Sequence, residues 1–348
     1  MRTGLVRLTR SLPKMLDLLV EQLNFGAHRP KLAITCSDIP SRYIDTLKQK
    51  CDVTVCEGTN RSDILRSISG AEGILWLTAD RLDSEALDVA GQQLKVVSTM
   101  TSGMDYVAAE EFSKRGIALG HTPKVVNDPV ADIAIGLMLA AARRFHEGRM
   151  KIATGQWEMR PQWMLGQDVP GSTVGIVGFG GIGQTILKRL KGFDIGRCLY
   201  TGRNRKVEAE QGGSGASYVD FATLLRESDF VFIACPLTGE TANMFNRETF
   251  ALMKPSSVLI NVARGGIVDQ PALVEALTNG TIFAAGLDVM TPEPLDTNDP
   301  LLSLPNCVVV PHLGTATKQS LLDMFTITAN NVLSVLAGGS LVAPFHKS

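Results

Sequence analysis

The sequence predicts an α/β protein that contains two parallel sheets, and three observations lead to this expectation. Short apolar runs recur along the chain, and polar-apolar stretches of helical length separate them. A glycine-rich turn follows one of these runs near the middle of the chain. The 348 residues are enough for two domains of ordinary size, each with its own core.

The first sheet is predicted from four strand-like runs in the first third of the chain. They cover residues 31–35, 51–57, 73–78 and 94–99. A long apolar segment then follows Pro129, and its composition predicts a largely buried helix.

The second sheet is predicted from six further runs, which make a complete dinucleotide-binding domain by count. They cover residues 173–178, 197–202, 229–235, 257–263, 283–289 and 307–312. The long amphipathic segment after the last run ends at Gly338, and we expect it to return to the first domain. The predicted organisation is an N-terminal extension (1–30), a first part of a substrate domain (31–125), a nucleotide-binding domain (126–314) and a C-terminal helix of the substrate domain (315–348).

The stretch "VGIVGFGGIGQ" has the G-x-G-x-x-G spacing, with a predicted strand before it and a predicted helix after it. In this context the glycines allow a tight turn, approach of the backbone to a pyrophosphate, and close packing of helix on strand. The pyrophosphate would lie at the helix N-terminus, where free N–H groups favour an anion. The expected cofactor contacts here are Gly178, Gly180, Gly181, Ile182 and Gly183.

The end of the next strand bears on the choice of cofactor. An enzyme that uses NAD places an acidic residue there to bind the ribose 2′-hydroxyl. This chain reads "LYTGRNRK" instead, with Arg203, Asn204 and Arg205 and no acid before Glu208. An arginine can hold a 2′-phosphate, so we expect NADP(H), with NAD(H) possible as a second cofactor.

Three charged residues follow strands in the second half of the chain: Arg264, Glu293 and His312. Together they suit reduction of a 2-keto acid. An arginine can hold the substrate carboxylate and polarise the keto oxygen. A histidine can deliver a proton, and a neighbouring carboxylate favours its protonated form.

With these motifs in view, the chain resembles the D-2-hydroxyacid dehydrogenases, most of all their glyoxylate/hydroxypyruvate reductases. The resemblance runs from about Lys31 to the end and includes "STMTSGMDYVA", "INVARGGIVDQPALVEAL", "AAGLDVMTPEPL" and "VVVPHLGTAT". It implies a Rossmann nucleotide-binding domain inserted into a flavodoxin-like substrate domain, both doubly wound, and a homodimer. It also implies substrate contacts at Ser102, Gly103, Met104, Arg264, His312 and the partner's Trp163, and cofactor contacts at Pro236, Val262, Asp288 and Gly314.

The expected activity is NADPH-dependent reduction of glyoxylate and hydroxypyruvate to glycolate and D-glycerate, with the proton from His312. The alternatives are another 2-keto acid reductase, a phosphoglycerate dehydrogenase-like enzyme, or a non-catalytic dinucleotide-sensing co-repressor. The missing acid in "LYTGRNR" disfavours the co-repressor, because those relatives use NAD.

The charge balance and the cysteines of the chain bear on which partners and which cell compartment we expect. Lys and Arg number 34 against 35 Asp and Glu, so charge indicates neither nucleic acid nor an anionic membrane as a partner. Six scattered cysteines without C-x-x-C predict no metal site and suit a reducing compartment, so we expect a cytoplasmic protein. Residues 1–30 begin basic and acid-poor, which is also typical of a mitochondrial presequence; the alternative is a disordered or loosely docked extension.

Overall fold

The computed structural model describes residues 16–17, 20–23 and 25–345. The chain divides into two compact units, Met1–Val126 with Thr317–Ser348, and Asn127–Ala316. The basic stretch 1–15, on which the presequence expectation depends, lies outside the described residues.

The first unit has a parallel sheet with the strand order β2-β1-β3-β4-β5. Its elements are β1 (Lys31–Ile34), α3 (Ser41–Lys48), β2 (Asp52–Val55), α4 (Arg61–Ile68), β3 (Gly73–Trp76), α5 (Ser84–Ala90), β4 (Val96–Thr99), α6 (Ala109–Arg115), β5 (Ala118–Gly120) and α14 (Lys318–Leu336). The order 2-1-3-4-5 is that of a flavodoxin-like sheet, and α14 packs on β3 and β4.

Side chains from both faces of this sheet are buried, as expected for a parallel sheet covered by helices. Along β1, Ala33 belongs to the core under α4 and α5, whereas Leu32 and Ile34 belong to the core under α3 and α14. The alternation follows from the two-residue period of a strand.

Part of the N-terminal extension belongs to this second core, which corrects the expectation of a loosely docked segment. Leu16, Val20 and Leu23 are buried, and they pack in one cluster with Tyr43 and Phe325. Leu16 and Val20 lie in helical backbone, and Leu23 follows directly after it. Burial of three large aliphatic side chains is the physical reason that this segment docks.

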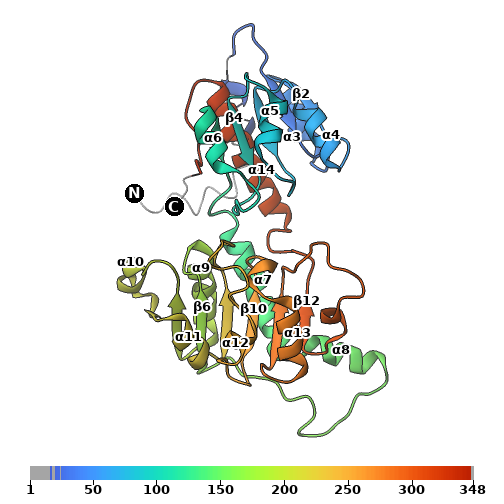
Figure 1. Ribbon diagram of the computed structural model, residues 1–348, viewed down its shortest axis with the longest axis vertical. Coiled ribbons are helices and arrows are strands. Elements are labelled where there is room, and N and C mark those ends of the chain that lie inside the picture. The colour runs from blue at the N-terminus through green and yellow to red at the C-terminus, as the bar shows by residue number, and fades with distance from the viewer. Residues whose placement is uncertain (1–15, 18–19, 24, 346–348) are drawn as a thin grey trace. The chain divides into compact units, whose positions relative to one another are not determined.

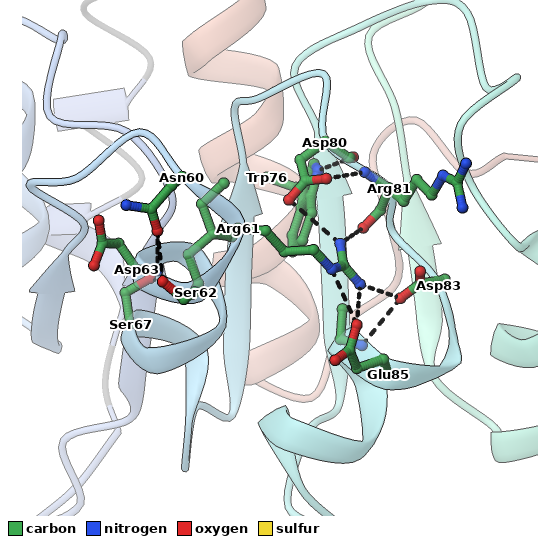
Figure 2. Close-up of polar contacts among 12 residues, drawn as sticks. Asn60, Arg61, Ser62, Asp63, Ser67, Trp76, Asp80, Arg81, Asp83 and Glu85 are labelled. Carbon is green, nitrogen blue, oxygen red and sulfur yellow. Dashed lines mark hydrogen bonds and ion pairs between the residues drawn. The ribbon is translucent and has the colours of Figure 1, made fainter.

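An ionic cluster connects α4 to the loop between β3 and α5 (Figure 2). Arg61, the first residue of α4, donates to the Asp83 carboxylate and to Glu85, each over 2.7 Å. Asp83 also accepts the Ala86 N–H and so caps α5. The cluster therefore fixes the start of two neighbouring helices.

The second unit has a parallel sheet with the order β12-β11-β10-β9-β6-β7-β8 (Figure 1). Its strands are β6 (Thr173–Val177), β7 (Arg197–Thr201), β8 (Ala216–Tyr218), β9 (Phe230–Ile233), β10 (Val258–Asn261), β11 (Ala284–Leu287) and β12 (Cys307–Val309). Its helical segments are α7 (Asn127–Ala142), α8 (Phe145–Ala153), α9 (Gly181–Leu190), η2 (Lys191–Phe193), α10 (Val207–Ala209), η3 (Glu210–Ser214), α11 (Phe221–Glu227), α12 (Arg247–Phe250), η4 (Gly265–Ile267), α13 (Gln270–Thr278) and η5 (Pro300–Ser303).

The strand order of the second unit positions its ligand site. The chain begins at β6, extends to β7 and β8 on one side, and then returns to β9 on the other side of β6. Ligands of such sheets bind at this reversal, outside the carboxyl ends of the strands. The glycine turn follows β6, and Pro236 follows β9, so both lie at the reversal.

Candidate active site

The glycine turn between β6 and α9 has the close contacts that a dinucleotide cradle requires. Gly178 has φ +95°, and a Cβ there would lie 2.5 Å from the Cys235 amide nitrogen. A Cβ at Gly183 would lie 2.3 Å from the Gly178 carbonyl oxygen, so only glycine lets α9 start this close to β6.

Gly180, the middle glycine of the G-x-G-x-x-G motif, borders open space. A Cβ at Gly180 would meet nothing within 4 Å, and no side chain caps the N-terminus of α9. Uncapped N–H groups at a helix start, beside open space, suit a pyrophosphate. The tight glycine contacts and the uncapped start of α9 therefore fit the dinucleotide that the sequence predicts.

The loop after β7 exposes the predicted Arg203, Asn204 and Arg205. Arg205 is paired with Glu210, whose Oε2 accepts from Nη2 over 2.8 Å. The sequence reasoning did not identify Glu210, because its spacing of five residues from Arg205 gives no helical pairing signal.

His312 and Glu293 form a hydrogen-bonded pair at the carboxyl ends of β12 and β11. The Nδ1 atom of His312 lies 2.7 Å from Oε2 of Glu293, whose Oε1 accepts the Met290 N–H over 2.9 Å. This hydrogen bond to Glu293 raises the pKa of His312 above its ordinary value, against the opposing effect of burial. Burial alone would raise the pKa of Glu293, but the bonds from His312 and Met290 hold it below its ordinary value. With Nδ1 occupied, Nε2 is the nitrogen that can exchange a proton with a ligand.

Asp288 holds the turn on which His312 lies. Its side chain is buried, and its two carboxylate oxygens accept the N–H groups of Leu313 (2.6 Å) and Gly314 (2.9 Å). His312 itself has φ +53°, a left-handed backbone conformation that costs energy for a residue with a Cβ. Burial raises the pKa of Asp288.

Arg264 follows β10, in a segment whose backbone is held by the side chain of Asn261. The Asn261 side chain accepts the Ala263 N–H and donates to the Arg264 carbonyl, over 3.0 and 2.9 Å. A Cβ on the next residue, Gly265, would lie 1.9 Å from the Met290 carbonyl oxygen. The loops after β10 and β11 are therefore in backbone contact, and the charge of Arg264 contributes to lowering the pKa of Glu293.

A model of the D-isomer specific 2-hydroxyacid dehydrogenase NAD-binding domain matches residues 135–314, which is more than half of the chain and includes all of these strand ends. The chain belongs to the D-2-hydroxyacid dehydrogenase family. It is therefore an oxidoreductase with an NAD(P)-binding Rossmann domain, and the second unit contains this domain.

Named relatives agree with this membership. The chain is 45% identical over 277 residues to the human glyoxylate reductase/hydroxypyruvate reductase, a match that covers 79% of this chain and 84% of the relative. It is 42% identical to a glyoxylate reductase of Thermococcus kodakarensis, over 89% of this chain and 94% of the relative.

A solved structure shares the fold of this dehydrogenase over most of its length. The NADPH-dependent glyoxylate/hydroxypyruvate reductase of Sinorhizobium meliloti, in complex with NADP and malonate, has a TM-score of 0.78 and 30% identity. The match covers 91% of this chain and 97% of that structure.

The other predicted contacts of this dehydrogenase are distributed over both units. Ser102, Gly103 and Met104 lie in the half-buried loop after β4 of the first unit, where the Thr99 hydroxyl contacts the Met104 sulfur over 3.5 Å. Val262 is buried and follows β10 directly. Trp163 is half-buried and lies in the segment of the chain that connects α8 to β6. Their roles toward substrate and cofactor stay predictions.

The described residues contain neither a candidate metal-binding cluster nor a helix that could span a membrane. No group of three or more His, Cys, Asp or Glu side chains among them could hold a metal ion. No helix in the described part of the chain is long and apolar enough to cross a membrane.

Proposed function

We propose that this protein reduces glyoxylate and hydroxypyruvate to glycolate and D-glycerate with NADPH. The observation that carries the proposal is the His312–Glu293 pair, since it supplies a proton donor at the carboxyl edge of a dinucleotide-binding sheet. The names of the relatives in human and in Thermococcus kodakarensis support the choice of substrates.

In the proposed mechanism each charged residue has one task. When bound, the reduced dinucleotide supplies a hydride to the keto carbon. Arg264 binds the substrate carboxylate and polarises the keto oxygen. His312 donates its Nε2 proton to that oxygen as negative charge develops there. Glu293 keeps the imidazole oriented and charged before the transfer.

Preference for NADPH rests on the loop after β7. Residues 202–206 include exposed arginines and no acidic residue, whereas an NAD enzyme places an acid at this strand end to bind the ribose hydroxyls. The solved relative from Sinorhizobium meliloti is named as NADPH-dependent and holds NADP, which supports the same assignment.

Steady-state oxidation of NADPH and NADH, with glyoxylate, hydroxypyruvate and pyruvate as acceptors, tests the proposal directly. We expect the highest kcat/KM with NADPH and either glyoxylate or hydroxypyruvate. Bound dinucleotide without turnover of any acceptor would refute the proposal and favour a dinucleotide sensor. Turnover of pyruvate alone would refute the substrate assignment while leaving the reaction type intact.

We also propose that the protein is a homodimer formed through the segment 145–165 of the second unit. Six large apolar side chains are exposed on this short segment, and a second copy that covers them would remove apolar surface from water. They are Phe145, Met150, Ile152, Trp157, Met159 and Leu165. Trp163 lies in the same segment, so a second copy could receive it at its substrate site.

Light scattering after size exclusion tests the homodimer. The wild type should have twice the chain mass, and Met159→Glu should reduce the dimer fraction, since Met159 is 89% exposed. Val342→Glu is the control, because Val342 is similarly apolar and exposed but belongs to the first unit. A monomeric wild type would contradict the proposal.

For the compartment, we propose the cytoplasm, with mitochondria as the alternative. The described cysteines are all free thiols, which suits a reducing compartment. Leu16 and Val20 are part of a core of the first unit. Cleavage of a presequence that included them would therefore expose the apolar side chains on which they pack. Microscopy of a C-terminally tagged chain, with N-terminal sequencing of the purified product, separates the two compartments.

A further inference from the structure

Tyr200, the fourth residue of β7, connects the glycine turn to the loop 202–206, which follows the strand end where dinucleotide-binding domains hold the adenosine ribose. Its side chain is fully buried, and its ring stacks on Phe179 of the glycine turn, with centroids 4.3 Å apart and planes 22° apart. Its hydroxyl accepts the Lys206 N–H over 2.7 Å. The loop 202–206 is therefore held in a defined position.

The same hydroxyl fixes a carboxylate beside this loop. Tyr200 donates to Oε1 of Glu210 over 2.6 Å. Arg205 approaches the carboxylate with Nε, 3.1 Å from both oxygens, and with Nη2, 2.8 Å from Oε2. The Glu210 side chain is only 15% exposed, whereas that of Arg205 is 61% exposed. The carboxylate is thus the fixed partner, and the arginine is the exposed one.

This arrangement changes the charge that a bound dinucleotide would meet. Glu210 occupies the Nε–Nη2 edge of the guanidinium, which is an edge that arginine uses to bind phosphate oxygens in pairs. Its negative charge also lies next to a group that would otherwise attract a 2′-phosphate. The bonds from Arg205 and Tyr200 lower the pKa of Glu210, so the carboxylate is charged at neutral pH.

We propose that Glu210 is a specificity-determining residue that weakens the attraction of this loop for a 2′-phosphate and so permits NADH as a second cofactor. Glu210 acts through Arg205 and the fixed Tyr200 hydroxyl. The inference rests on the proposed preference for NADPH, because it concerns the same 2′-phosphate subsite.

Glu210→Gln is the appropriate substitution, because the amide oxygen can still accept from Tyr200 while the negative charge is lost. An ion pair with one exposed partner, such as Arg205 here, changes affinity by about two- to fivefold, so the ratio of kcat/KM for NADPH over NADH should rise by about that factor. Glu275→Gln is the matched control, because Glu275 pairs with Arg247 in the same unit and the Arg247–Glu275 pair has no bond to the loop 202–206.

Calorimetry without turnover supplies an independent readout. Adenosine 2′,5′-bisphosphate and adenosine 5′-monophosphate differ in the 2′-phosphate, so their affinity ratio reports on this subsite alone. We expect E210Q to raise the ratio and E275Q to leave it unchanged. An unchanged or lowered ratio in E210Q, or equal changes for both probes, would overturn the role of Glu210. A wild type that prefers NADH would instead overturn the proposed cofactor preference. The comparison of E210Q with the wild type would still test Glu210, because it measures only how the affinity ratio of the two adenosine phosphates changes.

Discussion

Replacing Glu293 by glutamine tests the catalytic pair most directly. The wild-type contact joins two charged groups over 2.7 Å, and such bonds contribute about 1.5–3 kcal/mol, roughly twice a neutral bond. A glutamine amide has one acceptor oxygen, which can serve either His312 or the Met290 N–H. In both orientations the charged imidazolium loses the stabilisation of a carboxylate.

The size of the effect follows from exposure. His312 and Glu293 are 49% and 35% exposed, so water weakens the interaction to about 1 kcal/mol, which is below that range and at the upper end for exposed ion pairs. That energy is about a fivefold change in the population of the imidazolium. Since Glu293 raises the pKa of His312, its loss lowers that pKa, and the proton donor is lost at a lower pH.

The assay is kcat/KM for keto-acid reduction from about pH 5 to about pH 9, the range in which histidine titrates. For E293Q we expect the alkaline decline to begin at lower pH, with about fivefold less activity on that limb than the wild type. Glu227→Gln serves as the control, because Glu227 pairs with Arg197 on the surface of the same unit. An alkaline limb that stays in place, or moves to higher pH, would refute the assigned role of Glu293.

Four further substitutions test other parts of the site. His312→Ala should lower kcat by about 10²–10⁴, the usual contribution of a general acid, while calorimetry still detects dinucleotide binding; retained kcat would contradict its role. Arg264→Ala should raise KM for the keto acid and lower kcat together, and an unchanged KM in steady-state kinetics would argue against carboxylate binding. Arg203→Asp should lower the kcat/KM ratio of NADPH to NADH, whereas an unchanged ratio would remove Arg203 from the 2′-phosphate subsite. Gly183→Ala should abolish dinucleotide binding in a titration or lower Tm, since its methyl group would lie 2.3 Å from the Gly178 carbonyl oxygen; a variant that binds normally would show that the turn can relax.

Much of the fold could be predicted from local patterns. Apolar runs identified the buried strands, because a strand covered on both faces needs apolar side chains at nearly every position. Two strands were missed, β5 (Ala118–Gly120) and β8 (Ala216–Tyr218). Both are edge strands of only three residues, which is too short for an apolar run to stand out in the sequence. In β8 two of the three residues are also exposed.

By itself, the sequence determined the glycine turn, the residues at the strand ends and the absence of an acid from the loop 202–206, because these depend on residue type and near-neighbour spacing. Only the tertiary structure showed that Tyr200 binds Glu210, that Asp288 holds the turn of His312, and that Leu16 and Val20 pack with Phe325. The physical reason is that a hydrogen bond or an apolar contact depends on distance and direction. For residues as far apart in the chain as Leu16 and Phe325, those are set by the packing of whole helices and strands.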